Sequence, residues 1–382
     1  MRIEGARNSS LTSGPSAASG ASAASGASAA SGASAASGAS AASGASAAWS
    51  LADRLAASED PVVAYQAGRL LAERAAGARA AAAPELDALR ARIARSPMAR
   101  ALRRALETHE PLHAYKKWQG PHWTLVSLAL IDYPPGDDSL QPLMRHVDDW
   151  LFSKKHLNPP GTTVYEGQED RVRRCGSQEG NAIWYAVRLG LENDRTIELV
   201  DRLVRWQWPD GGWNCDKRRE ARSSSLQETA IPARGLWAFG QRHGYEPAIR
   251  AADRAAELML SHRLLWRRRD GAMIEPDWGG AVDLIQFPIQ FYDVLFALQV
   301  MAELGRIGDR RCDDALALLA SKRLPDGGFP LELCNATPSD RIASRGSYAR
   351  WGPAGTRRSN PLVSLIGLGV LQAAERVRAV PT

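Results

Sequence analysis

The chain has 382 residues and a formal net charge of +6, and 45% of its residues are hydrophobic. No apolar run reaches about 18 residues, so the sequence predicts no transmembrane helix, and no apolar core follows Arg2 and Arg7, which argues against a secretory signal. Four cysteines in a chain of this length do not make a disulfide framework, which favours a reducing, cytoplasmic location.

Basic residues gather at Arg171–Arg174 and at Arg267–Arg269. We interpret them mainly as a solvated basic face. The alternative is that they bind an anionic ligand such as a diphosphate, or make peripheral contact with an acidic lipid membrane surface. No motif typical of nucleic-acid binding is present, and nothing in the sequence identifies a protein partner.

Residues 13–48 consist of six copies of the hexapeptide Ser-Gly-x-Ser-Ala-Ala. The stretch has no large apolar side chain, so no buried surface can offset the entropy of ordering it. We therefore predict a disordered tail over residues 1–48, with no chemistry of its own.

Residues 49–114 are rich in Ala, Leu, Arg and Glu, and apolar residues recur there three and four positions apart. Pro61 and Pro84 suit first helical turns, because the N–H that proline lacks has no partner within the helix there. The pattern predicts a helical lead-in, either an appendix or the first part of the next domain, with short helices over residues 51–57, 62–74, 86–96 and 98–106.

From Tyr115 onward, helices alternate with turns rich in Gly and Pro. Three amphipathic segments each end at an Asp-Gly turn, over residues 199–208, 258–269 and 316–324. The turn glycines are Gly211, Gly271 and Gly327, so they recur after 60 and 56 residues. A period of this length is typical of stacked helix pairs.

A second class of helix lies between these turns and is apolar around most of its girth, over residues 122–131, 181–191, 228–240, 288–304 and 361–376. Helices of this kind are buried, whereas amphipathic helices keep one face in solvent. The alternation predicts an outer ring of helices around an inner ring. We therefore expect an all-α fold, an α/α toroid of about five to six helix pairs over residues 115–382.

The turn at residues 206–213 resembles the Gln-Trp motif of squalene cyclases, with Gln207, Gly211 and Trp213 at the matching positions. Residues 324–329 resemble the turn that recurs in protein prenyltransferase β subunits. On these motifs the chain resembles the superfamily of terpenoid cyclases, including squalene–hopene cyclases, and prenyltransferase β subunits. The resemblance implies an α/α toroid whose central cavity binds an isoprenoid or another apolar substrate.

Residues 117–123, 175–181 and 214–217 resemble strings in an uncharacterised bacterial subgroup of these proteins. The chain lacks the Asp-x-Asp-Asp motif with which squalene cyclases protonate an alkene. It also lacks the Asp-Asp-x-x-Asp motif that holds Mg²⁺ against a diphosphate. The resemblance therefore predicts the fold rather than the reaction.

Asp210, Cys215 and Asp216 lie around the first of these turns. Prenyltransferase β subunits place an Asp, a Cys and a later His around zinc, so the resemblance implies Asp210 and Cys215 as zinc ligands. A catalytic zinc site needs three protein ligands, and the helices predicted over residues 288–304 and 361–376 contain no His. We therefore favour a protein without a cofactor, in which Cys215 is a small buried residue and Asp216 caps a turn or acts as a catalytic acid or base.

The segment Cys175–Asn181 places polar side chains at the N-terminus of a predicted inner helix, an end that attracts anions. One interpretation is a site at the cavity mouth, where Cys175 and Asn181 bind substrate and Glu179 acts as an acid or base. The alternative is simple capping by Ser177 or Asn181.

Ser225 and Glu228 are three residues apart, which is the spacing of a capping box at the start of the next inner helix. This position would also bring Glu228 to the same end of the cavity as Cys215, as a substrate-binding residue.

Tyr292 and Asp293 fall on the inner helix predicted over residues 288–304. An ionised Asp293 would be costly to bury unpaired, so it either meets an Arg or has the raised pKa that a general acid requires. Tyr292 and Trp184 belong to a set of aromatic residues on inner helices. These rings either stabilise a carbocation or fill the space between the two rings of helices.

We therefore predict an enzyme that binds an isoprenoid or similar apolar small molecule and begins its chemistry by protonation or by handling a diphosphate. The candidate catalytic residues are Glu179, Asp293 and Asp216, and the candidate substrate-binding residues are Cys175, Asn181, Trp184, Glu228 and Tyr292. Two alternatives stay open. One is a non-catalytic ligand-binding or scaffold toroid whose cavity is filled by its own side chains, and the other is a zinc-dependent transferase with a partner subunit.

Overall fold

The computed structural model describes residues 49–75, 79–107, 112–157, 164–165, 168–218, 220–275 and 281–379, all within one compact unit that runs from Gly44 to Thr382. This part of the chain is predominantly helical, which confirms the expected helical class. The repeats of residues 13–48 lie outside the described residues. None of the described helices is both long and apolar enough to cross a membrane.

The first helices are residues 49–56, α2 (Pro61–Arg74), α3 (Arg79–Ile93), α4 (Pro97–Arg103) and the 3₁₀ helix η1 (Arg104–Leu106). Pro61 begins α2 as predicted, and the side chain of Asp60 caps it by accepting a hydrogen bond from the Val62 N–H. Pro84 lies inside α3 rather than in its first turn, so that expectation was wrong.

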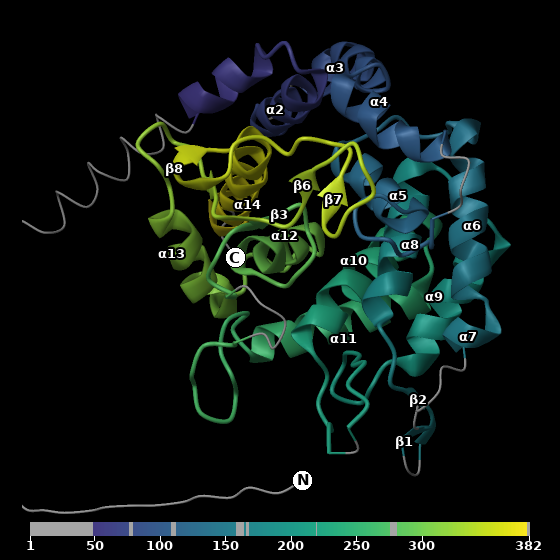
Figure 1. Cartoon of the computed structure of the whole chain (residues 1–382). Helices are drawn as coiled ribbons and strands as arrows, with labels where there is room; N and C mark the ends of the chain where they lie inside the picture. Colours follow the sequence, from purple (N-terminus) through teal and green to yellow (C-terminus); the bar gives the residue numbers. More distant parts are fainter. Residues whose placement is uncertain are drawn as a thin grey trace, which may run out of the picture. The chain divides into compact units, whose positions relative to one another are not determined.

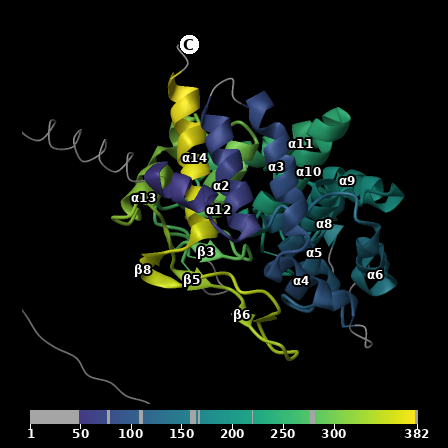
Figure 2. The same ribbon diagram turned by 90° about the horizontal axis from the view of Figure 1, so that it is seen from above.

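The apolar helices predicted as buried are α5 (Pro121–Leu130), α8 (Gly176–Leu189), α10 (Leu226–His243), α12 (Val294–Glu303) and α14 (Pro361–Ala379). They alternate with the partly exposed helices α6 (Gln141–Leu151), α9 (Asp194–Trp206), α11 (Glu246–Ser261) and α13 (Asp313–Ser321). Each of the first four apolar helices packs against the partly exposed helix that follows it, and consecutive apolar helices pack side by side (Figures 1 and 2).

The remaining short elements are α7 (Lys154–Leu157), η2 (Asp138–Leu140), η3 (Arg310–Cys312) and four two-stranded ladders. The antiparallel ladders pair β1 (Val164–Tyr165) with β2 (Gln168–Val172) and β4 (Pro330–Leu331) with β8 (Gly355–Ser359). The parallel ladders pair β3 (Gln286–Phe287) with β5 (Leu333–Cys334) and β6 (Thr337–Pro338) with β7 (Gly346–Ser347).

The turn at residues 207–213 fastens α9 to α11. The amide nitrogen of Gln207 donates to the carbonyl oxygens of Gly211 and Ala251, both at 2.7 Å. Gly211 adopts a positive φ of 102°, which favours glycine. The indole N–H of Trp213 then donates back to the Leu203 carbonyl at 3.1 Å, so the aromatic ring folds onto the helix it follows, as predicted.

Helices α8 and α10 touch backbone to backbone. A Cβ atom added to Gly180 would lie 2.6 Å from both the Cα and the N of Pro232, so only glycine fits at this crossing. The contact brings the N-terminal ends of the two helices together, and these ends carry the candidate site.

The boundaries of several predicted helices differ in the structure, and in two cases the backbone shows why. The segment predicted over residues 258–269 is helical only to Ser261, because Arg263 and Leu264 adopt positive φ values and turn the chain away. The helix predicted from residue 288 begins at Val294, since Gln286–Phe287 pairs in a ladder and Asp293 is the capping residue of α12.

Candidate functional site

A cavity of about 260 Å³ lies at the N-terminal ends of α5, α8 and α10, and we call it the head pocket. Its lining residues come from five separate stretches of the chain: Tyr115, Lys117, His122, Trp123, Cys175, Ser177, Gln178, Asn181, Cys215, Gln227, Glu228, Ile231, Gln290 and Phe291. The structure thus brings together four residues that the sequence singled out, namely Cys175, Asn181, Cys215 and Glu228.

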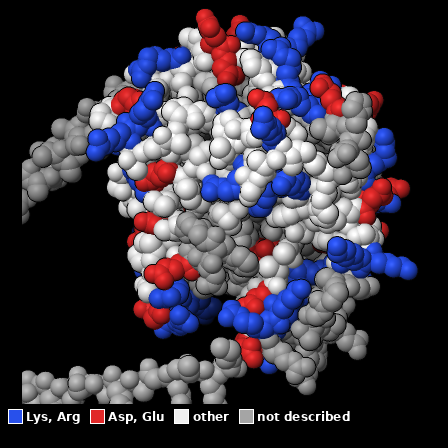
Figure 3. Space-filling view, in the orientation of Figure 1, with Lys and Arg blue, Asp and Glu red and all other residues white. Residues whose placement is uncertain are grey.

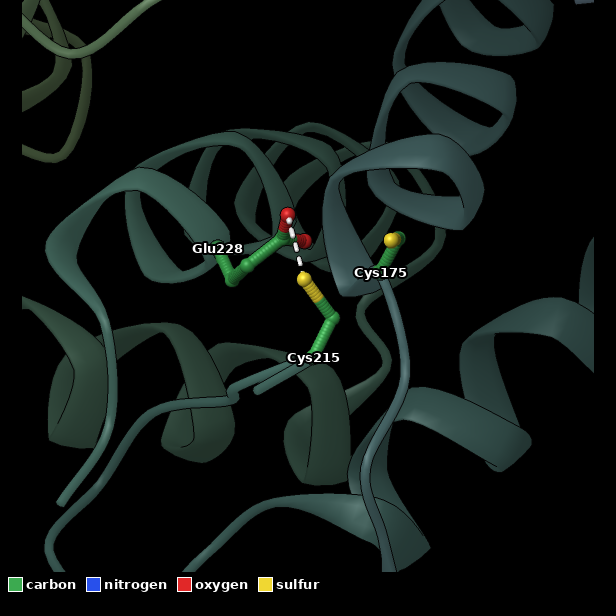
Figure 4. Close-up of side chains that lie close together, drawn as sticks. All are labelled: Cys175, Cys215 and Glu228. Atoms are coloured by element: carbon green, nitrogen blue, oxygen red, sulfur yellow. Dashed lines mark hydrogen bonds between the residues drawn. The ribbon is translucent and has the colours of Figure 1, made fainter. Parts of the chain in front are cut away.

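Cys175, Cys215 and Glu228 lie close together in the head pocket (Figure 4). One ligand atom from each lies within 4.8 Å of the other two. Cys175 is the N-cap residue of α8, Cys215 follows the turn at residues 207–213, and Glu228 lies in the first turn of α10. The Cys215 thiol donates to Glu228 Oε1 at 3.6 Å, while the Ser177 N–H donates to Glu228 Oε2 at 2.8 Å. We call these three residues the Cys-Cys-Glu cluster.

The capping box expected at the start of α10 is not formed. Ser225 is the N-cap residue, but its side chain makes no capping hydrogen bond. The carboxyl group of Glu228 instead reaches the N-terminus of α8, because the close contact of α8 and α10 places the Ser177 N–H within its range.

Burial shifts the proton affinities of the ionisable groups in the head pocket. It raises the pKa of Glu228, and the pKa of Cys215 is raised by its hydrogen bond to Cys175, by burial and by the nearby Glu228 carboxylate. Burial lowers the pKa of Lys117 to about 8, against the opposing pull of Glu228. His122, whose pKa burial lowers to about 3, is neutral. Its Nε2 atom has no hydrogen-bond partner within the described part of the chain.

One wall of the head pocket is aromatic. The ammonium nitrogen of Lys117 lies 4.3 Å from the ring centre of Trp123, 5.5 Å from that of Tyr115 and 5.7 Å from that of Phe291. Ring faces attract a cation at such distances. The pocket therefore offers an apolar wall and, opposite it, a set of polar and acidic groups.

Glu179 does not line the head pocket. It is 1% exposed and lies on the other side of α8, where its Oε1 accepts a hydrogen bond from Arg202 at 3.1 Å and lies 3.5 Å from Nε2 of His156. A carboxylate held by a buried guanidinium is a structural ion pair. Glu179, which the sequence predicted as a candidate acid, therefore has no contact with the head pocket.

Asp216, Asp210 and Asp293 also lie away from the head pocket. Asp216 pairs with Arg218 at 2.6 Å, and Asp210 accepts two hydrogen bonds from Ser224, each at 2.6 Å. Asp293 caps α12 by accepting from the Phe296 N–H at 2.7 Å, and burial raises its pKa to about 7. The geometry therefore does not support Asp210 and Cys215 as ligands of one metal ion.

Trp184 lines a second cavity, of about 390 Å³, which we call the rear cavity. Helices α2, α5, α8, α10, α12 and α14 all contribute to it, and it shares no lining residue with the head pocket. Arg234 lies 3.8 Å over the Trp184 ring and forms two hydrogen bonds of 2.7 Å with Glu303.

Tyr292 lines a third, more open hollow of about 790 Å³, the basic groove. Its lining includes four arginines (Arg222, Arg267, Arg268 and Arg269) against two carboxylates (Asp210 and Glu275). Figure 3 shows Lys and Arg gathered with some carboxylates along the lower edge of one face. Gln227 lines both the basic groove and the head pocket, and hydrogen bonds to the backbone of Gln290 and Tyr292 hold its side chain in place.

Sequence reasoning missed Lys117, His122, Tyr115 and Trp123 as pocket residues. Pro121 in the first turn of α5 could have placed His122 at the same helix end as Cys175 and Glu228. No comparable signal exists for Lys117, because it lies in the irregular segment before α5.

Comparisons with known proteins add nothing to this geometry, since no family model matches the chain and no curated protein is similar enough to count as a match.

Proposed function

We propose that this chain is a transferase-type enzyme built on an α/α toroid, and that the head pocket is its active site. The inner ring of this toroid would consist of α2, α5, α8, α10, α12 and α14. Three observations support the ring. These six helices line one rear cavity, and successive members of the series α5, α8, α10, α12, α14 and α2 pack together. In addition, Gln66 on α2 donates to the carbonyl of Leu130, the last residue of α5.

The observation that carries the proposed activity is the convergence of six ionisable side chains on one small cavity. They come from four stretches of the chain: Tyr115, Lys117, His122, Cys175, Cys215 and Glu228. Burying polar and charged groups without full pairing costs stability, and perturbed proton affinities cluster at active sites.

The shape and charge of the surroundings indicate the kind of substrate. A cavity of about 260 Å³ suits a short apolar body beside Trp123, Phe291 and Ile231. Lys117 and the neighbouring basic groove attract an anionic group. A short-chain isoprenoid diphosphate has both features, whereas a long polycyclisation substrate exceeds the pocket.

Calorimetric titration with geranyl diphosphate tests this proposal. Turnover is measured as release of inorganic pyrophosphate in the presence of a small thiol, so that the thiol or water takes the geranyl group as the C–O bond to the diphosphate breaks. We expect binding that weakens at least about tenfold in Lys117→Met, which removes a charged hydrogen-bond donor, and in Ile231→Trp, which fills the pocket. The exposed Lys154→Met is the matched control and should bind normally. Because the pKa of Lys117 is lowered to about 8, affinity should fall as pH rises through that value.

The second candidate is a non-catalytic ligand-binding toroid, which the rear cavity favours because Arg234, Glu303 and Trp184 fill much of its wall with paired side chains. Binding without pyrophosphate release would support this alternative. Absence of binding to the wild-type chain would contradict both candidates.

A further inference from the structure

We propose that the Cys-Cys-Glu cluster binds one zinc ion, with Cys175, Cys215 and Glu228 as its three protein ligands and a fourth position open to the head pocket. This inference concerns the pocket of the proposed function, but zinc binding itself requires no turnover.

The spacing of the ligand atoms fits zinc. In a tetrahedral site with Zn–S near 2.3 Å and Zn–O near 2.1 Å, ligand atoms lie about 3.6–3.8 Å apart. The Cys215 Sγ and Glu228 Oε1 atoms are 3.6 Å apart, and all three ligand atoms lie within 4.8 Å of one another. Only small side-chain adjustments are needed to surround an ion.

The carboxyl group is already oriented for this role. The Ser177 N–H holds Glu228 Oε2 at 2.8 Å, which leaves Oε1 directed at the thiol of Cys215 (Figure 4). Metal-binding carboxylates are commonly fixed in this way by hydrogen bonds from neighbouring groups. Glu228 is 6% exposed, so water competes little with an ion for the carboxylate.

The charges balance around a divalent ion. Two thiolates, one carboxylate and Zn²⁺ together carry one negative charge, and Lys117 on the wall of the same pocket supplies one positive charge. Thiolate ligands favour zinc over Mg²⁺ or Ca²⁺, which prefer oxygen. Three ligands beside a cavity, rather than four in a closed shell, are typical of catalytic zinc sites.

Zinc uptake by the full-length, chelator-treated protein tests the inference, with elemental analysis for stoichiometry and a competing chromogenic chelator for affinity. We expect one Zn²⁺ per chain. Affinity should fall at least about tenfold in Cys175→Ser, Cys215→Ser and Glu228→Gln, the last of which keeps an acceptor for the Ser177 N–H. Circular dichroism shows whether each variant is folded.

Cys334→Ser and Asp210→Asn are the matched controls. Cys334 donates to the Ala336 carbonyl, away from the cluster, and Asp210 is the ligand that the sequence paired with Cys215. Both should bind zinc as the wild type does. No zinc uptake by the folded wild-type chain, or uptake unchanged in both Cys175→Ser and Cys215→Ser, would overturn the inference. Either result is obtained without substrate, so it is separate from failure of the proposed activity.

Discussion

Glu179→Ala is expected to lower the free energy of unfolding by about 3–5 kcal/mol, because it leaves a buried guanidinium without its counter-charge. Arg202 is 4% exposed and donates to Glu179 at 3.1 Å. Burial lowers the pKa of the nearby buried Arg174, and the same carboxylate opposes that shift. Urea denaturation followed by circular dichroism measures the change.

Glu198→Ala is the matched control for this variant. Glu198 also lies near Arg202, at 3.5 Å, but its side chain is 64% exposed and such pairs contribute at most about 1 kcal/mol. If Glu179 were instead the catalytic acid suggested by the sequence, Glu179→Ala would unfold like the wild type and lose only turnover. That outcome would contradict the structural role described above.

The second large effect is expected at the crossing of α8 and α10. Gly180→Ala places a Cβ atom 2.6 Å from the Cα and N of Pro232, where backbone rather than a movable side chain must give way. Overpacking of this kind costs about 1–3 kcal/mol. Since the crossing also positions Ser177 against Glu228, we expect zinc affinity to fall in the same variant.

Gly369→Ala in α14 tests whether that loss is specific to the crossing. Its added Cβ atom would meet only Leu70 Cδ1, at 3.7 Å, an ordinary contact. Alanine at a compatible helical position stabilises by about 0.4–1 kcal/mol, so the variant should match or exceed the wild type in urea. Equal stability of the two alanine variants would contradict the close backbone contact.

Helix type and order could be predicted because they depend on local patterns. The apolar periodicity after Pro361 and the glycine turn after α9 can both be predicted from the chain, and the structure has a helix and a turn there as expected. The predicted helix boundaries are wrong where contacts with a neighbouring segment determine the backbone conformation. Arg263 and Leu264 end α11 with positive φ values that their residue types do not favour, and pairing of Gln286 with Leu333 delays the start of α12.

The sequence predicted that Glu228 and Cys215 lie at the same end of a cavity. The complete site nevertheless depends on tertiary contacts, because the packing of α8 on α10 brings Cys175 close to them. Glu179 shows the converse. It is one helical turn from the same end, yet the period of α8 turns it toward Arg202 and away from the cavity.

Chemical cross-linking of thiols in the wild-type protein tests most directly whether the segments that carry Cys175 and Cys215 lie close together. Phenylarsine oxide joins two thiols only when they lie close together, and peptide mass spectrometry identifies the pair. We expect the reagent to join Cys175 to Cys215, whose sulfur atoms lie within 4.8 Å, and to leave Cys312 and Cys334 unbridged. Failure to bridge Cys175 and Cys215 in the folded, reduced protein, or bridging of either to Cys312 or Cys334, would contradict the head pocket as described.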